Sequence, residues 1–132
     1  MAVVLNKIAF DYAKKLIANR RCVLDERGDW SDHKPSRQIE NRFIEEHGFA
    51  EYAKWHLGED DEIEEHSKSR YKFPYGDFQA IHRCAVLAAE ARAGQYKHFD
   101  IEQAAAVLLH MLNQLLEEKT TATKERRHAP SA

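Results

Sequence analysis

One short stretch organises the chain: Arg70-Tyr71-Lys72-Phe73-Pro74-Tyr75-Gly76-Asp77. It combines aromatic rings with positive charge, and it reads as an ordered loop. Pro74 has a restricted φ angle and favours an extended conformation at the residue before it. Gly76 permits a sharp turn, and Asp77 is a residue type that often caps the start of a helix. The stretch therefore predicts a shaped loop that leads into a helix beginning at Asp77.

A helical hairpin is expected directly after this loop. Its first helix should cover residues 77–93 and end at Gly94, and its second should cover residues 101 to about 119, with Asp100 as the cap. Apolar residues recur at helical spacing in both segments. Because the connection between them is short, the two helices should pack antiparallel.

The N-terminal half shows three further helical patterns, at residues 5–20, 36–47 and 49–57. Gly48 separates the last two, and Gly58 should end the third. The acidic run at residues 59–65 then reads as a solvated linker between two helical halves. The sequence thus predicts an all-α fold of about five helices, with the C-terminal antiparallel hairpin as scaffold and the shorter N-terminal helices packed across it.

Length and composition are those of one soluble domain. The chain has 132 residues and a net charge of -2, and we expect a single helical domain at residues 1–119 with a disordered polar tail at 120–132. Its near-neutral charge indicates neither a polyanion nor a membrane partner. No apolar run approaches the roughly 20 residues that span a bilayer, and the N-terminus lacks the features of a signal peptide. Cys22 and Cys84 are expected to be thiols of a reducing compartment. These features predict a cytoplasmic protein.

Cationic and aromatic residues form two candidate binding clusters. The loop cluster contains Arg70, Lys72, Tyr75, His82 and Arg83, and the hairpin-tip cluster contains Arg92, Tyr96, Lys97 and His98. Along the predicted helix the tip lies about 22 Å from Asp77. One pocket therefore cannot contain both clusters unless the first half of the chain folds across the hairpin. An alternative is that the rings fill the core and the cations are solvated or paired with the acidic run.

Signals for metal binding and catalysis are weak in the sequence. Asp29, Asp32 and His33 share a loop and are possible metal ligands, but scattered loop carboxylates usually face water. Neither the Glu-x-x-His spacing of di-iron bundles nor a His-Glu-x-x-His motif occurs. Cys84 and His82, two apart on the predicted helix, should point in different directions. The sequence predicts no catalytic residue, no metal ligand and no cofactor.

Several segments together resemble a block of sequence from small bacterial proteins. They are residues 70–78, His82-Arg83-Cys84, residues 87–90, residues 92–98 and Ile101-Glu102. The block is similar to that of an uncharacterised family, with a looser likeness to segments of some phage-encoded proteins, and the likeness covers roughly residues 40–115. The resemblance implies a small helical domain and carries no mechanism.

Three functions are compatible with this sequence, and it favours a role without catalysis. The leading hypothesis is a small cytoplasmic interaction module that binds itself or another protein. The second is an accessory nucleic-acid-binding protein, since rings among cations stack bases and bind phosphates, although a pI of 6.4 is low for such a domain. The third is a small metal-dependent enzyme.

Overall fold

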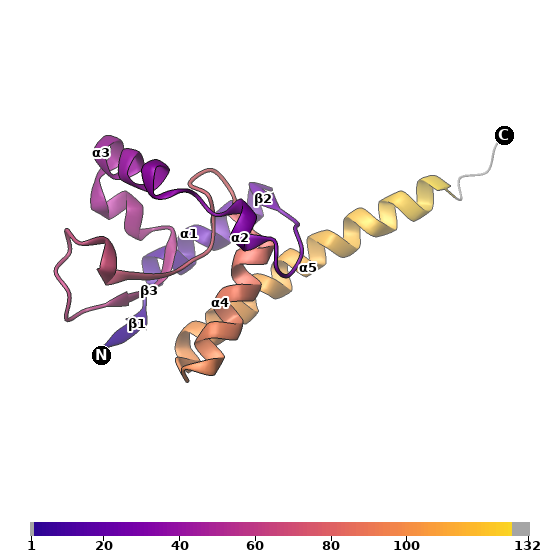
Figure 1. Ribbon diagram of the computed structural model, residues 1–132. Helices are drawn as coiled ribbons and strands as arrows, with labels where there is room; N and C mark the ends of the chain where they lie inside the picture. Colours follow the sequence, from indigo (N-terminus) through magenta and orange to yellow (C-terminus); the bar gives the residue numbers. More distant parts are fainter. Residues whose placement is uncertain (1, 128–132) are drawn as a thin grey trace.

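The structure, a computed structural model, describes residues 2–127, with side chains described as far as residue 122. Helices account for 60% and strands for 14% of it, so the expected all-α helical bundle is wrong and the fold is mixed α/β. Figure 1 shows β1 (Val3–Leu5) and β3 (His56–Asp60) on one side of the molecule and the two C-terminal helices on the other. Among the described residues, no helix is long and apolar enough to span a bilayer.

The larger sheet is antiparallel and has the strand order β1-β3-β4, formed by Val3–Leu5, His56–Asp60 and Tyr71–Pro74. Strand β3 replaces the expected end of a helix and the start of the acidic linker. Gly58 explains the difference, because a Cβ atom there would lie 2.8 Å from Phe73 and 3.0 Å from Ile101. This glycine permits close packing on a strand; it does not end a helix.

The smaller sheet joins segments that are far apart in the sequence. Strand β2 (Cys22–Val23) pairs in parallel with β5 (Ile81–His82), so that Val23 lies opposite His82. Two-residue strands are too short to show the alternation of apolar and polar residues by which a strand is recognised. Neither strand could therefore be predicted from the periodicity of the sequence.

The N-terminal helices agree with the sequence more closely. Helix α1 (Lys7–Ala18) begins after Asn6, whose side chain accepts a hydrogen bond from the amide of Ala9. Helix α2 (Trp30–His33) is a single turn, and α3 (Arg37–Ala53) is capped by Ser36. Gly48 has a φ of 85° and interrupts α3, which confirms the predicted break there. A short 3-10 helix, η1 (Lys68–Arg70), precedes β4.

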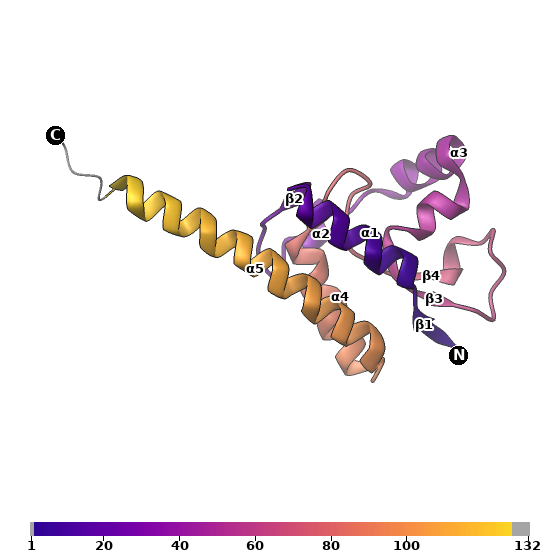
Figure 2. The ribbon, with the colours of Figure 1, turned by 180° about the vertical axis from the view of Figure 1, so that it is seen from behind.

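The predicted C-terminal hairpin is present, with different ends. Helices α4 (Arg83–Gln95) and α5 (Phe99–Arg127) lie side by side in both views (Figures 1 and 2). Helix α4 does not begin at Asp77, because that carboxylate accepts the amides of Gln79 and Ala80 and shapes a turn before β5. Helix α5 continues past residue 119, and its C-terminal half projects from the body of the protein. Residues 128–132 of the expected tail lie outside the described part of the chain.

Strand β4 carries an unusual backbone conformation at Phe73. Its φ is 60°, so the prediction that Pro74 leaves this residue with an ordinary extended φ is wrong. A bulky residue at positive φ is strained, and the surrounding structure must hold it there. Phe73 is 8% exposed as a residue, and its ring packs close to Gly58, which supplies part of that restraint.

Candidate metal centre

Four side chains with metal-binding atoms converge where β2 and β5 end. They are Asp25, His33, His82 and Cys84, and their ligand atoms all lie within 4.8 Å of one another. Asp25 follows β2, while His82 ends β5 and Cys84 lies in the first turn of α4. Because the carboxyl ends of parallel strands meet at one edge of a sheet, this pairing brings the residues together. His33, in α2, completes the group.

Asp25 is the centre of the cluster. Its Oδ2 atom lies 2.8 Å from Nδ1 of His33, 2.8 Å from Nδ1 of His82 and 3.0 Å from Sγ of Cys84. Its Oδ1 atom accepts the backbone N–H of Cys84 at 2.7 Å. A carboxylate at a helix N-terminus is stabilised by the free amides and the helix dipole. Asp25 thus caps α4, the role that the sequence assigned to Asp77.

Hydrogen bonds set the charge states in the cluster. Burial disfavours ionisation of Asp25, but hydrogen bonds from Cys84, His33 and His82 outweigh it and hold the pKa of the carboxyl below its usual range. Burial, reinforced by the hydrogen bond to Asp25 and its charge, raises the pKa of the Cys84 thiol. The thiol donates to a carboxylate, whereas an activated cysteine needs an adjacent base or a lowered pKa. The arrangement does not favour a cysteine nucleophile.

His82 is held through both ring nitrogens. Nδ1 faces Asp25, and Nε2 lies 2.8 Å from Oδ2 of Asp77, while the residue as a whole is 5% exposed. Burial opposes ionisation of Asp77, but the hydrogen bond from His82 and two backbone amides lower the pKa of that carboxyl. Metal-binding histidines commonly donate the second ring N–H to a carboxylate in this way, which orients the ring and leaves the other nitrogen for the ion.

The donor set suits zinc. Two imidazoles, a thiolate and a carboxylate are all zinc ligands, and four protein donors complete a tetrahedral shell of the structural kind. Bond lengths of about 2.0–2.3 Å place tetrahedral donors roughly 3.3–3.6 Å apart. The contacts of Asp25 at 2.8–3.0 Å would open by roughly half an ångström to admit the ion. His33 is the accessible ligand, since 40% of its side chain is exposed.

The predicted loop cluster is dispersed in the structure. His82 lies in the metal cluster, and Arg83 braces it, donating to the carbonyl of Asp25 at 3.1 Å and to Asn113 at 2.8 Å. Lys72 lies in β4. These side chains do not share one binding surface.

The other two members of the loop cluster have structural contacts. Tyr75 is fully buried, and its hydroxyl donates to the carbonyl of Lys54 at 2.6 Å. Arg70 donates to the carbonyl of Ile63 at 2.6 Å, and its Nε lies 3.5 Å from Glu59. The alternative interpretation, that rings fill the core and cations pair with the acidic run, describes this pair well.

The hairpin-tip cluster remains at the surface. The Arg92 guanidinium lies over the Tyr96 ring at 5.7 Å from its centroid, and Tyr96 is 57% exposed. Lys97 has a φ of 61° in the turn between α4 and α5. His98 contacts Phe73 edge-on, with ring centroids 5.9 Å apart. Arg92 also lines a hollow that Cys84 borders.

The sequence reading missed Asp25, Cys84 and Asp77 as site residues. Its metal hypothesis had named His33 together with Asp29 and Asp32, but Asp29 accepts the amide of Glu26 at 2.9 Å and neither aspartate joins the cluster. The error at Cys84 has a clear origin, because placing His82 and Cys84 on one helix separated side chains that the strand end brings together.

Comparison with known proteins adds no relative: no family model, no curated protein and no solved structure matches the chain.

Proposed function

We propose that this protein binds one zinc ion through Asp25, His33, His82 and Cys84. The observation that carries the proposal is the convergence of four zinc-ligand atoms within 4.8 Å from separate parts of the chain. The proposal departs from the expectation of no metal ligand. It is supported further by Asp77, whose carboxylate engages the outer nitrogen of His82 at 2.8 Å.

The ion would act in this proposal as a structural tether. The segment between β2 and α3 has few buried side chains, and Asp25 is its buried polar residue at 9% exposure. A shared ion joins that segment, through Asp25 and His33, to the end of β5 and the start of α4. Because all four positions are filled by protein donors, binding stabilises the fold and leaves no open coordination site for a substrate.

Metal content and affinity test this proposal. We expect one zinc per chain by elemental analysis of protein purified without chelator, and one-site binding when zinc is titrated into stripped protein. His82→Ala and Cys84→Ala should abolish that site. The matched controls are His110→Ala, an exposed histidine on α5, and Cys22→Ala, the other free cysteine. Absence of zinc binding in the wild type, or equal loss in the controls, contradicts the proposal.

Self-association is the second candidate, in keeping with the interaction module expected from the sequence. The C-terminal half of α5 extends beyond the body of the protein (Figure 2). Leu115, at its start, packs against the core, and Leu116 beside it is half-buried. A second copy of this helix is the occupant we propose for that surface. Sedimentation equilibrium should then show a dimer whose population rises with concentration, and a strict monomer across the accessible range contradicts it.

A further inference from the structure

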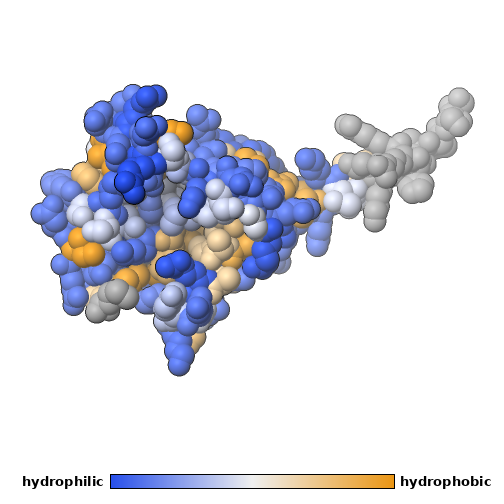
Figure 3. Space-filling model, viewed as in Figure 1, coloured by the Kyte–Doolittle hydropathy of each residue, from blue (hydrophilic) through white to orange (hydrophobic). Residues whose placement is uncertain are grey.

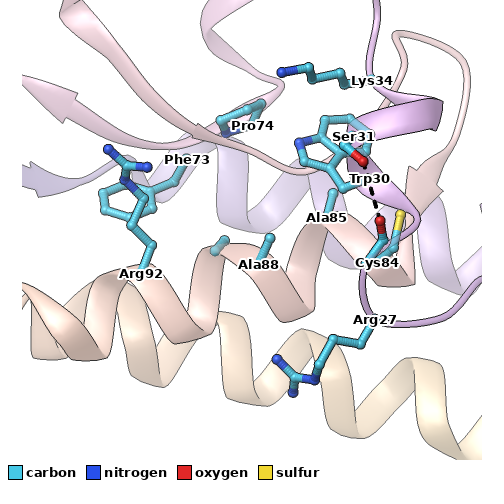
Figure 4. A pocket seen from close by; sticks show the side chains of 12 residues that line it. Arg27, Trp30, Ser31, Lys34, Phe73, Pro74, Cys84, Ala85, Ala88 and Arg92 are labelled. Carbon is cyan, nitrogen blue, oxygen red and sulfur yellow. Dashed lines mark hydrogen bonds between the residues drawn. The ribbon is translucent and has the colours of Figure 1, made fainter.

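A hollow of about 550 Å³ lies beside the metal cluster, between the α2 segment, β4 and α4 (Figure 4). Its floor is made by Ala85, Ala88 and Ala89 of α4. Alanine side chains end at Cβ, so this face of the helix leaves space that larger residues would fill. The volume is in the range of small-molecule sites.

The walls of the hollow are apolar and partly aromatic. Trp30 stands on one side, close to Cys84, and Phe73 with Pro74 forms the opposite side (Figure 4). Phe73 is the residue held at a φ of 60°, and strained backbone of this kind tends to cluster at ligand sites. In Figure 3 the surface over α4 shows a pale apolar patch surrounded by blue hydrophilic groups. A flat apolar body fits such walls.

The charge at the rim has a single sign. Arg27, Lys34 and Arg92 border the hollow, and none of the described residues that line it is acidic. Among the described residues, no carboxylate forms an ion pair with any of these three side chains, and the Arg92 guanidinium lies over the neutral ring of Tyr96. Three unpaired cations around one hollow, in a chain whose net charge is -2, focus a positive potential on it.

We propose that this hollow binds a small aromatic oxyanion, with the ring against the alanine floor and Trp30, and the oxyanion at the Arg92 and Lys34 rim. Guanidinium and ammonium groups form strong hydrogen bonds with carboxylates and phosphates, and an aromatic ring gains from contact with the apolar walls. The inference goes beyond the zinc proposal and does not rest on it, although Cys84 borders both sites.

Matched naphthalene probes test the ligand class on the full-length protein as purified, with its zinc content measured in parallel. Titrations with 1-naphthoate, 1-naphthyl phosphate, neutral 1-naphthalenemethanol and cationic 1-naphthylmethylammonium are followed by Trp fluorescence and calorimetry. We expect the two anions to bind at least about tenfold more tightly than the neutral ring, and the cation to bind weakest. The ratio of the dissociation constants of the two anions shows whether carboxylate or phosphate is the preferred group. Equal binding of charged and neutral probes, or no binding at millimolar concentration, overturns the proposal.

Three variants locate the site. Arg92→Gln should weaken the anions about tenfold and leave the neutral ring unchanged. Ala88→Leu, at an exposed floor position that tolerates a larger side chain, should weaken every probe. Arg42→Gln, an exposed cation on α3 away from the hollow, should change none. Zinc content is measured in the same samples, so that loss of zinc can be distinguished from loss of anion binding. Unchanged anion binding in Arg92→Gln overturns the placement.

Discussion

Two buried histidines in this protein, His56 and His82, have opposite surroundings. They are 3% and 5% exposed, respectively. His56 donates to the carbonyl of Tyr52 at 2.9 Å and lies among the rings of Tyr52 and Tyr71, whereas both nitrogens of His82 face carboxylates. Burial alone therefore says little about what a histidine does. The partners of its two ring nitrogens separate a neutral core side chain from a candidate metal ligand.

Replacing each histidine by alanine should give the largest contrast. Both variants lose packing, but only His82→Ala should lose the additional stability conferred by zinc. At free zinc about a thousandfold above the dissociation constant, that contribution is about 4 kcal/mol. Thermal unfolding with and without zinc measures it. The proposed difference between the two histidines is contradicted if zinc still raises the unfolding temperature of His82→Ala, or if this effect of zinc is lost equally in His56→Ala.

The pH dependence of stability should belong to His56. Burial lowers the pKa of His56 to about 4 from an ordinary value of 6.5, and the nearby positive charge of Lys68 acts in the same direction. The unfolded chain therefore binds a proton between these values while the folded chain does not, so the free energy of unfolding falls as the pH drops from 6.5 toward 4. The loss is up to about 3 kcal/mol.

Chemical denaturation across this pH range checks the assignment. Wild type and His56→Gln are compared with chelator present, so that metal contributes to neither curve. The glutamine retains a donor for the Tyr52 carbonyl and cannot titrate, so we expect a flatter curve for that variant. Parallel curves for the two proteins would assign the pH dependence to other groups.

Asp77→Asn should weaken zinc binding without abolishing it. Asp77 accepts the amides of Gln79 and Ala80 with one oxygen and the ring N–H of His82 with the other. Asparagine has a single acceptor oxygen, so the variant loses the negative charge and one of these two sets of hydrogen bonds. Loss of such outer partners commonly lowers metal affinity about 10–100-fold. Competition with a chromophoric chelator measures the change. An affinity equal to that of the wild type would remove Asp77 from the metal centre.

Ser36→Ala should have the smallest effect and should leave zinc untouched. Its hydroxyl accepts the amide of Ile39 at 3.2 Å and caps α3. Loss of this cap costs about 1 kcal/mol. Denaturant titration gives the stability change, and zinc titration of the same variant shows whether modest destabilisation by itself alters the metal site. Weakened zinc binding by Ser36→Ala would show that modest destabilisation alone alters the metal site.

Local patterns in the sequence predicted what depends on neighbouring residues. Helix α1, the break at Gly48 and the α4–α5 hairpin follow from apolar periodicity and a glycine. The strands could not be predicted in this way, because β2 and β5 have two residues each and β3 includes acidic side chains that resemble a linker. The sequence therefore predicted an all-α fold, although the structure also contains strands.

The metal cluster could not be predicted from the sequence for a related reason. Asp25 and Cys84 are 59 positions apart, and the parallel pairing of β2 with β5 helps to bring them together. Asp77 had the residue type of a helix cap, yet the cap of α4 comes from Asp25. Spacing rules find ligands that share one helix or loop, whereas these four residues come from two distant segments, one with Asp25 and His33 and one with His82 and Cys84.

Cobalt substitution tests the central claim most directly. Cobalt(II) added to stripped wild-type protein should produce, at one equivalent, the intense visible absorption of a tetrahedral site and a thiolate-to-metal band in the near ultraviolet. Zinc should abolish both, and Cys84→Ser should lack the thiolate band. Weak octahedral spectra that do not saturate at one equivalent would contradict the account, and His82 would then be a hydrogen-bonded core side chain between two carboxylates.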